Sequence, residues 1–254
     1  MIGIAIEQGL IQSTSQSASD FIDEWEADGR ASITIQQLLD MRSGLVPKCS
    51  SFETGVVGEC GDYLSASSGG DILYSTDQLS GCIDRELAVS GSVYPWVSSG
   101  GDGAYEVGQF YYSNCDTQVL GEILFRASGQ DTGLFAQQNL FEPLNIEADW
   151  WRDGVETGQA NGNYLTYCCL DMTAQDFAKF GYMLLLGGVE TSEGKNYASY
   201  ISNILAQEQT YRNQFWAYCD TQPFTASADC ANVLVMTIGL SLIHISEPTR
   251  PSSI

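Results

Sequence analysis

The chain contains very little histidine and lysine. Of its 254 residues, only His244 is a histidine, and only Lys48, Lys179 and Lys195 are lysines. A Ser-His-Asp triad, a Cys-His pair and a histidine-based zinc site each need a well-placed imidazole. A lysine-activated nucleophile has only three candidate activators here. The sequence therefore argues against most common arrangements for nucleophilic catalysis and for metal binding.

The lone histidine lies in a segment that we expect to be foreign to the protein. Residues 240–250, Leu-Ser-Leu-Ile-His-Ile-Ser-Glu-Pro-Thr-Arg, read as the translation of a transposase-type sequencing adapter. The apolar pattern before this segment stops without a cap or a turn. We interpret residues 240–254 as an adapter-derived tail and leave them out of fold and function reasoning. The alternative, a genuine polar tail, would return His244 to the protein.

Basic residues and long apolar runs are also scarce. Ten Lys and Arg stand against 32 Asp and Glu, a net charge of −22 at pH 7. This balance argues against nucleic acids and anionic membranes as partners, because phosphate contacts need clustered cations. No apolar run approaches the length that spans a bilayer. Since 44% of the residues are hydrophobic, the chain can bury a sizeable core.

The chain contains more cysteines than is usual for a cytosolic protein without a Cys-x-x-Cys pattern. No Cys-x-x-Cys pattern occurs, and the irregular spacings make metal binding by cysteine alone a weak alternative. We expect disulfides and an oxidising compartment, secreted or periplasmic, with a signal peptide lost together with the N-terminus. The pairing cannot be read from the sequence. Cys60 with Cys82 is one guess, and buried free thiols are another possibility. The eight cysteines are Cys49, Cys60, Cys82, Cys115, Cys168, Cys169, Cys219 and Cys230.

Helix-start and helix-stop signals predict helices joined by loops. Thr34-x-x-Gln37 is a capping box for a helix over 35–43 that ends at Gly44. Asp131 starts a helix that should end before Pro143, because the residue before a proline disfavours helix. Further predicted elements are an apolar helix over 3–11, a helix capped by Thr173-x-x-Asp176 and stopped by Gly187-Gly188, a helix over 197–205, and strands over 213–218 and 232–238.

The segment Tyr112-Ser113-Asn114 is the strongest candidate for chemistry. Residues 108–111 approach it as an extended aromatic stretch, and Ser113-x-x-Asp116 is a capping pattern for the amphipathic helix that follows. A phenol and a carboxamide would then lie at a helix N-terminus. By itself, Tyr-x-Asn fits equally well a buried tyrosine beside a helix cap.

Only one Ser-x-x-Lys occurs, at Ser192–Lys195. It follows Gly187-Gly188 and precedes a helix-like segment, so we expect it in a polar turn. A nucleophile needs a rigid, partly buried position, and we interpret this match as chance.

An ordered set of motifs resembles the class C β-lactamase-related serine hydrolases. The family includes β-lactamases, D-alanyl peptidases, short-chain esterases and aminohexanoate-oligomer hydrolases. The match covers most of residues 1–205, and Trp150-Trp151-Arg152-Asp153 looks closest to its amide and ester hydrolase branch. The segments that carry the resemblance are 32–45 with its Ser-Gly-Leu, Gly108–Asn114 with its Gly, Phe and Tyr-Ser-Asn in the family's order, Leu120–Ile123, Gly129-Gln130, Phe141–Leu144 and Asp176–Gly181.

The resemblance implies an α/β (α+β) fold in which helices flank an antiparallel sheet. This chain would cover mainly the helical region and little of the sheet, so apolar helix faces would be exposed. We expect a partial hydrolase domain over residues 1–239, with a cysteine-containing insertion over 46–107.

The resemblance also implies roles for the central tripeptide. In this family a serine of Ser-x-x-Lys attacks a carbonyl to form an acyl-enzyme. Tyr112 is then the candidate general base and acid, and Asn114 would hydrogen-bond the lysine and the substrate amide. Ser113 is expected to be a helix cap rather than a nucleophile. The implied partner is a small-molecule amide or ester substrate, with no cofactor and no metal, and the oligomeric state stays open.

Two of the family's three motifs are absent from the chain. By resemblance, Ser-x-x-Lys should lie just upstream of Met1, and the Lys/His-Thr/Ser-Gly strand should follow where the adapter begins. We therefore expect an inactive fragment of an active hydrolase. Two alternatives remain: a catalytically dead penicillin-recognising binding module, and an unrelated helical protein with chance matches.

Overall fold

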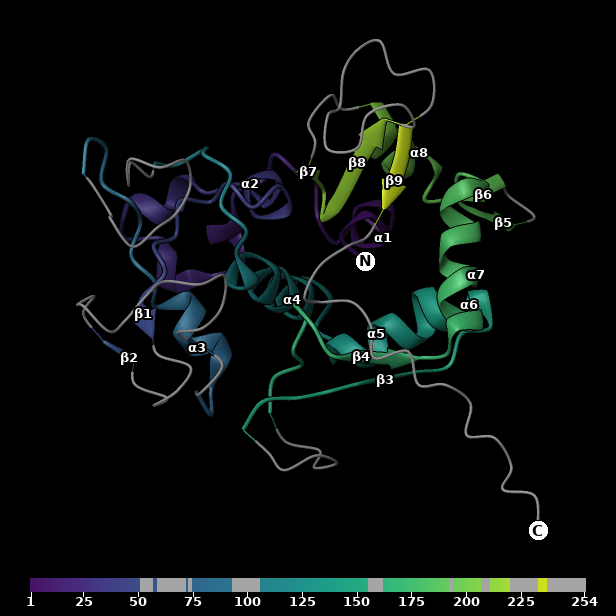
Figure 1. Ribbon diagram of the computed structural model, residues 1–254, viewed down its shortest axis with the longest axis horizontal. Coiled ribbons are helices and arrows are strands. Elements are labelled where there is room, and N and C mark those ends of the chain that lie inside the picture. Colours follow the sequence, from purple (N-terminus) through teal and green to yellow (C-terminus); the bar gives the residue numbers. More distant parts are fainter. Residues whose placement is uncertain are drawn as a thin grey trace. The chain divides into compact units, whose positions relative to one another are not determined.

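The structure is a computed structural model that divides into two units (Figure 1). It describes residues 1–50, 57–58, 72, 75–92, 106–154, 162–191, 194–206, 211–219 and 233–236. The first unit is built from residues 1–10, 128–151 and 168–254, and the second from residues 11–127 and 152–167. The predicted tail over 240–254 and much of the predicted insertion over 46–107 lie outside the described residues.

The second unit is built mainly from short helices around a buried tryptophan. Trp25 is fully buried, and its indole Nε1 donates a hydrogen bond to the carbonyl of Ile83 at 2.9 Å. Ile33 and Leu38, the hydrophobic pair around the predicted capping box, are buried as well. Its elements are η1 Ala18–Asp20, η2 Asp23–Trp25, η3 Gly29–Ser32, α2 Ile35–Leu39, β1 Cys49–Ser50, β2 Val57–Gly58, α3 Gln78–Ile83 and most of α4 Asn114–Ser128.

The start of α2 is confirmed, but its predicted end is wrong. The hydroxyl of Thr34 accepts from the backbone of Gln37, and the Gln37 side chain accepts from the backbone of Thr34. The helix ends at Leu39 instead of residue 43 because Met41 has a φ of 53°, in the left-handed region. Gly44, the predicted stop, has a φ of 81° and completes the turn.

Helix α4 is the longest helix that the structure describes. Its apolar residues at helical spacing, among them Val119 and Ile123, are buried, as the sequence pattern predicts. Gly121 lets the segment around Thr166 approach the helix closely, since a Cβ at Gly121 would lie 2.4 Å from Thr166 Cγ2. Thr166 Oγ1 in turn donates to the carbonyl of Thr117 at 3.0 Å. Helix α4 and the 162–167 segment are thereby tied together within the second unit.

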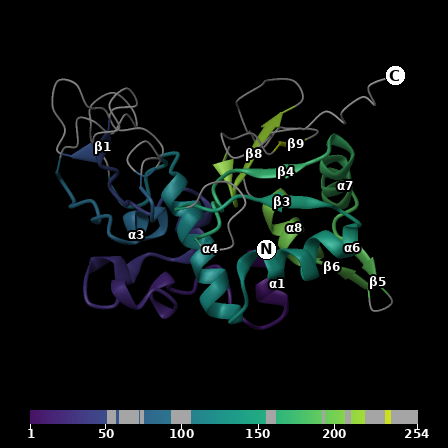
Figure 2. The same cartoon turned by 90° about the horizontal axis from the view of Figure 1, so that it is seen from below.

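In its described residues, the first unit contains the remaining helices and three small antiparallel sheets. β3 pairs with β4, β5 with β6, and β8 lies between β7 and β9. Figure 2 shows β3 and β4 running side by side. The elements are α1 Ile2–Glu7, α5 Thr132–Ala136, the π-helical turn η4 Gln137–Phe141, α6 Glu142–Leu144, β3 Ala148–Trp150, β4 Leu170–Met172, α7 Ala174–Leu185, β5 Val189–Thr191, β6 Gly194–Asn196, α8 Ala198–Ala206, β7 Tyr211–Arg212, β8 Phe215–Cys219 and β9 Val233–Met236.

Most predicted elements of this unit are confirmed. Asp131 caps α5 by accepting from the backbone of Leu134, and Thr173 caps α7 by accepting from Asp176. The prediction that the helix ends before Pro143 is wrong. Helical structure continues through the π turn into α6, whose first turn contains Pro143, a position at which helices tolerate proline. Helix α1 is shorter than predicted and ends at Glu7.

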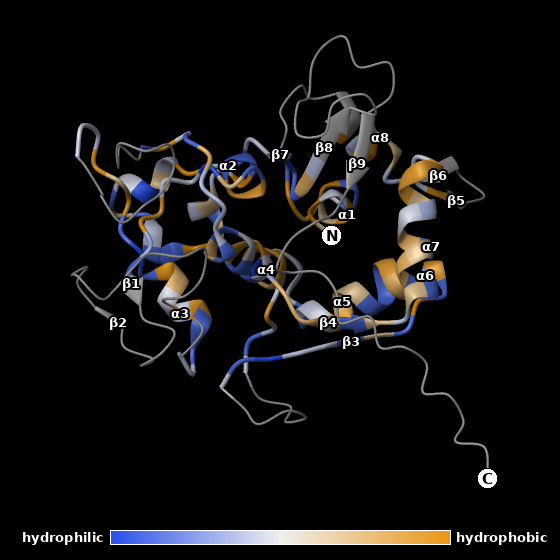
Figure 3. Cartoon of the chain, viewed as in Figure 1, coloured by the Kyte–Doolittle hydropathy of each residue, from blue (hydrophilic) through white to orange (hydrophobic). Residues whose placement is uncertain are grey.

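Helix α7 exposes apolar side chains at its C-terminal end. Tyr182 is 61% and Leu185 80% exposed, and Leu186, which follows the helix, is also exposed. Figure 3 shows hydrophobic colouring along this helix. This agrees with the expectation of exposed apolar helix faces. The small sheets and the dominance of helix match the predicted α/β class with little sheet.

Two glycine-to-alanine substitutions should have opposite effects on stability. Gly121→Ala should lower the free energy of unfolding by about 1–3 kcal/mol, because Thr166 would have to move. The Cβ added by Gly181→Ala, in α7, meets no heavy atom within 4 Å. This substitution should raise the free energy of unfolding by about 0.5–1 kcal/mol. Urea denaturation of the three proteins measures both. An unchanged midpoint for Gly121→Ala would contradict the close approach.

Candidate active site

The loop that carries Tyr112 is held by backbone hydrogen bonds to the turn after α2. The N–H of Tyr111 donates to the carbonyl of Met41 at 3.0 Å, and that of Gly108 donates to the carbonyl of Arg42 at 2.9 Å. Arg42 Nη1 donates a hydrogen bond to the Gly108 carbonyl at 2.8 Å. Residues 108–113 form no strand, so the aromatic stretch before Tyr112, for which a strand or an extended loop fits the sequence, is a loop. These contacts fix the backbone immediately before Tyr112.

Within the tripeptide, only the tyrosine is partly exposed. Tyr112 is half-buried, whereas Ser113 is fully buried and Asn114 is 6% exposed. Asn114 is the first residue of α4, as predicted. The backbone N–H of Asp116 donates to Ser113 Oγ at 3.3 Å, which confirms Ser113 as the helix cap.

A buried carboxyl connects α4 to the Ser-Gly-Leu segment. Ser43 Oγ donates to Asp116 Oδ1 at 2.8 Å and accepts from the N–H of Leu45 at 3.1 Å. Within the described part of the chain, Asp116 Oδ2 has no hydrogen-bond partner. Burial raises the pKa of Asp116 to about 7, against the opposing effects of the Ser43 and Ser113 hydroxyls and the positive charge of buried Arg85. This carboxyl therefore titrates near neutrality.

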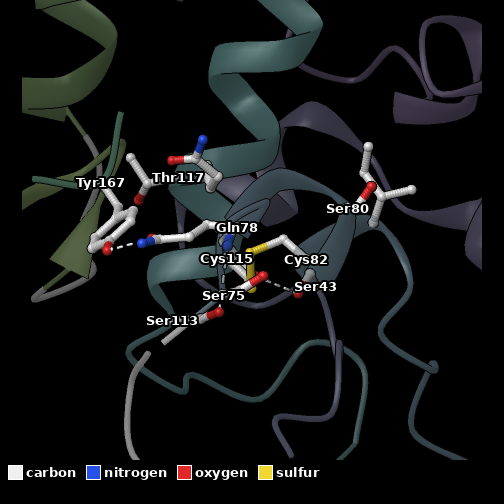
Figure 4. The surroundings of a disulfide bond; sticks show 12 residues. Ser43, Ser75, Gln78, Ser80, Cys82, Ser113, Cys115, Thr117 and Tyr167 are labelled. Atoms are coloured by element: carbon white, nitrogen blue, oxygen red, sulfur yellow. Dashed lines mark hydrogen bonds between the residues drawn. A yellow bond between two sulfur atoms is a disulfide. The ribbon is translucent and has the colours of Figure 1, made fainter. Parts of the chain in front are cut away.

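A disulfide fixes the first turn of α4 to α3 (Figure 4). Cys82 and Cys115 are both fully buried, with their Cα atoms 5.0 Å apart. The guess that Cys60 pairs with Cys82 is wrong, because the packing of α3 against α4 brings Cys115 to Cys82 instead. The bond spans a sequence separation of 33. Loop-closure entropy for that length stabilises the fold by about 3–4 kcal/mol in the chain-entropy picture.

A second network beside the disulfide was not found by the sequence reasoning. The Tyr167 hydroxyl donates to Gln78 Oε1 at 2.7 Å (Figure 4). The backbone N–H of Gln78 donates to Asp153 Oδ2 at 2.7 Å. Asp153 Oδ1 accepts from the N–H of Asn163, also at 2.7 Å. Burial raises the pKa of Tyr167 to about 12, and the Asp153 charge acts in the same direction. Tyr167 therefore stays protonated and acts as a hydrogen-bond donor.

The lone Ser-x-x-Lys does not form a helical nucleophile site. Lys195 lies in β6, opposite Glu190 of β5, whereas Ser192 lies outside the described residues. Of the other lysines, Lys179 forms an ion pair with Asp176 and a hydrogen bond to the carbonyl of Asn145. Among the described residues, no cluster of three or more His, Cys, Asp or Glu side chains could hold a metal ion. No helix in the described part is long and apolar enough for a membrane span.

Comparison with known proteins identifies the fold. No protein-family profile and no curated protein matches the chain. A protein assigned as a 6-aminohexanoate-dimer hydrolase from Bacillus anthracis matches with a TM-score of 0.58 and 21% identity, over 85% of this chain and 54% of its own. A class C β-lactamase from Rhodobacter sphaeroides matches with a TM-score of 0.54 and 14% identity, over 87% of this chain and 58% of its own. The chain has the fold of serine β-lactamases and penicillin-binding proteins.

A penicillin-binding protein from Bacillus halodurans supports the same assignment. It matches with a TM-score of 0.51 and 16% identity, over 89% of this chain and 68% of its own. The chain spans little more than half the length of the first two structures. The predicted β-lactamase fold is therefore confirmed, while the identities are too low to transfer an activity.

The buried Asp116 should make stability depend on pH. Its folded pKa of about 7 lies above the ordinary value of 3.8. The contribution of protonated Asp116 to the free energy of unfolding is therefore complete below pH 4. This contribution is lost as the pH rises through 7, by up to roughly 4 kcal/mol. Asp116→Asn should flatten this dependence and raise the urea midpoint at pH 8 relative to the unsubstituted protein.

The matched control for this prediction is Asp23→Asn, at an exposed position. It should leave the difference in unfolding free energy between pH 5 and pH 8 unchanged. Equal pH dependence in Asp116→Asn and in the unsubstituted protein would contradict the elevated pKa.

Proposed function

We propose that the chain is part of a serine hydrolase that cleaves an amide or ester bond through an acyl-enzyme. The observation that carries the proposal is the placement of Tyr112 at the start of α4, in a β-lactamase fold and with the family's motifs in their order. The chain contains no Ser-x-x-Lys at the start of a buried helix. The nucleophile would be supplied by sequence that these 254 residues do not include, so the chain alone would be inactive.

In this proposal Tyr112 moves the proton. The nucleophilic serine gives its proton to the phenolate of Tyr112 as its oxygen bonds to the substrate carbonyl carbon, and Tyr112 then returns the proton to the leaving group. A phenol has a pKa of about 10, so the phenolate needs a nearby cation at neutral pH. The lysine of Ser-x-x-Lys would supply that charge.

Asn114 would position the substrate and that lysine. Its place in the first turn of α4 is fixed by the Ser113 cap and by the neighbouring Cys82–Cys115 disulfide. A carboxamide held in this way can accept from an ammonium group and donate to a carbonyl oxygen at the same time. The expected partner is a small-molecule amide or ester, and no role is assigned to a metal or a cofactor.

A secreted or periplasmic location fits this proposal. Cys82–Cys115 is a buried disulfide that joins two helices, and structural disulfides of this kind persist in oxidising compartments.

The test uses the coding sequence extended in both directions from this chain. The extended protein should contain Ser-x-x-Lys and hydrolyse p-nitrophenyl esters with a burst of p-nitrophenol, whereas the 254-residue chain should not. Tyr112→Phe in the extended protein should lower kcat/KM by about 10²- to 10⁴-fold. Tyr182→Phe, at an exposed tyrosine of α7, is the matched control and should leave the rate unchanged.

Two results would overturn the assignment. Full hydrolysis by Tyr112→Phe would remove the phenol from the mechanism. An extended protein in which both Ser-x-x-Lys and the Lys/His-Thr/Ser-Gly strand are replaced would instead indicate a catalytically dead binding module.

A further inference from the structure

Two adjacent cysteines, Cys168 and Cys169, form a disulfide with each other at the start of β4. A bond between neighbours closes a ring that contains a single peptide bond. It joins no distant segments, so it removes almost no entropy from the unfolded chain. The Cys82–Cys115 bond, with a sequence separation of 33, does remove entropy from the unfolded chain. Loop closure therefore does not explain why the adjacent pair is oxidised.

Among the described residues, the adjacent pair is also the more accessible of the two disulfides. Cys168 and Cys169 are both partly exposed, whereas Cys82 and Cys115 are fully buried. A thiolate reduces a disulfide by attacking one sulfur along a direct approach, so access strongly affects the rate. An external thiol can therefore reach Cys168–Cys169 in the folded protein, while the buried bond is protected.

Both cysteines accept hydrogen bonds from the tryptophan pair Trp150–Trp151. The indole Nε1 of Trp150 donates to the carbonyl of Cys168 at 3.0 Å, and the backbone N–H of Trp151 donates to the carbonyl of Cys169 at 3.0 Å. Trp151 Nε1 also donates to Asp171 Oδ2 at 2.9 Å. The Cys168 carbonyl therefore holds the Trp150 indole, and the Cys169 carbonyl holds the backbone of Trp151 beside the β3–β4 pair.

The backbone of Cys169 provides the link between oxidation state and structure. Its φ of 64° lies in the left-handed region, which a residue with a Cβ rarely adopts. The ring formed with Cys168 restricts this backbone. Once the ring opens, Cys169 can return to an ordinary φ, and its carbonyl then turns away from the N–H of Trp151.

We propose that Cys168–Cys169 is a reversible redox modification site whose reduction by a dithiol rearranges the Trp150–Trp151 segment. One reagent thiolate attacks a cysteine sulfur, which breaks the S–S bond and forms a mixed disulfide. The reagent's second thiolate then displaces the protein sulfur and leaves as a cyclic disulfide. The reagent supplies both electrons, and the two cysteine thiolates take up protons. The product is a pair of neighbouring thiols.

The first test is trapping of thiols in the native, oxidised 254-residue chain. After brief treatment with dithiothreitol, alkylation with iodoacetamide and peptide mass spectrometry measure the rate at each cysteine. Cys168 and Cys169 should be alkylated at least about tenfold faster than Cys82 and Cys115. In a second sample, reduced in the same way, freed of dithiothreitol and not alkylated, phenylarsine oxide should add to the reduced pair, as its arsenic bonds both sulfurs and one water leaves. Equal alkylation rates at the two disulfides would refute the site.

The second test follows the structural response. Tryptophan emission should change in step with the alkylation of Cys168 and Cys169. The double variant Cys168→Ser, Cys169→Gly should lose this response, and glycine at 169 tolerates the positive φ. Trp216→Phe, at a tryptophan of β8, is the matched control and should keep the change in tryptophan emission. A response that persists in the double variant, or its absence when trapping shows complete reduction of the pair, would refute the rearrangement.

Discussion

The candidate site depends on one backbone conformation, the left-handed turn at Met41. With its φ of 53°, Met41 directs its carbonyl to the N–H of Tyr111 and its sulfur to the N–H of Ser113, 3.4 Å away. A left-handed conformation costs a residue with a Cβ about 1–2 kcal/mol. The hydrogen bonds between this turn and the 108–113 loop offset that cost. The turn therefore helps to fix the backbone on both sides of Tyr112.

A buried positive charge acts on Asp116 in this strongly acidic protein. Arg85 is fully buried within the second unit, and its charge favours the ionised form of Asp116. The desolvation of the carboxyl is nevertheless the larger effect, so the Asp116 pKa is raised. The Ser43–Asp116 bond thus joins α4 to the segment after α2 through a group whose charge changes near neutral pH. Buried polar contacts of this kind specify one arrangement of helices.

Local signals allowed the sequence to predict the helix starts. The caps at Thr34, Ser113, Asp131 and Thr173 each involve a partner three residues away, so their chemistry can be read from spacing alone. The motif order also predicted the fold. The pairing of Cys82 with Cys115 could not be read in this way, because it depends on how helices pack. The Tyr167–Gln78 bond, between residues 89 positions apart, has no local signal either.

The caps also have a consequence for the order of folding. Their hydrogen bonds close loops of three residues and can form before the chain collapses. The contacts that hold the Tyr112 loop, such as Ser43 to Asp116 with a separation of 73, need much longer loops to close. We therefore expect the N-terminus of α4 to form early in folding. The loop that carries Tyr112 should reach its final position late. Oxidation of Cys115 with Cys82 would come last and retain an arrangement that the helices have already reached.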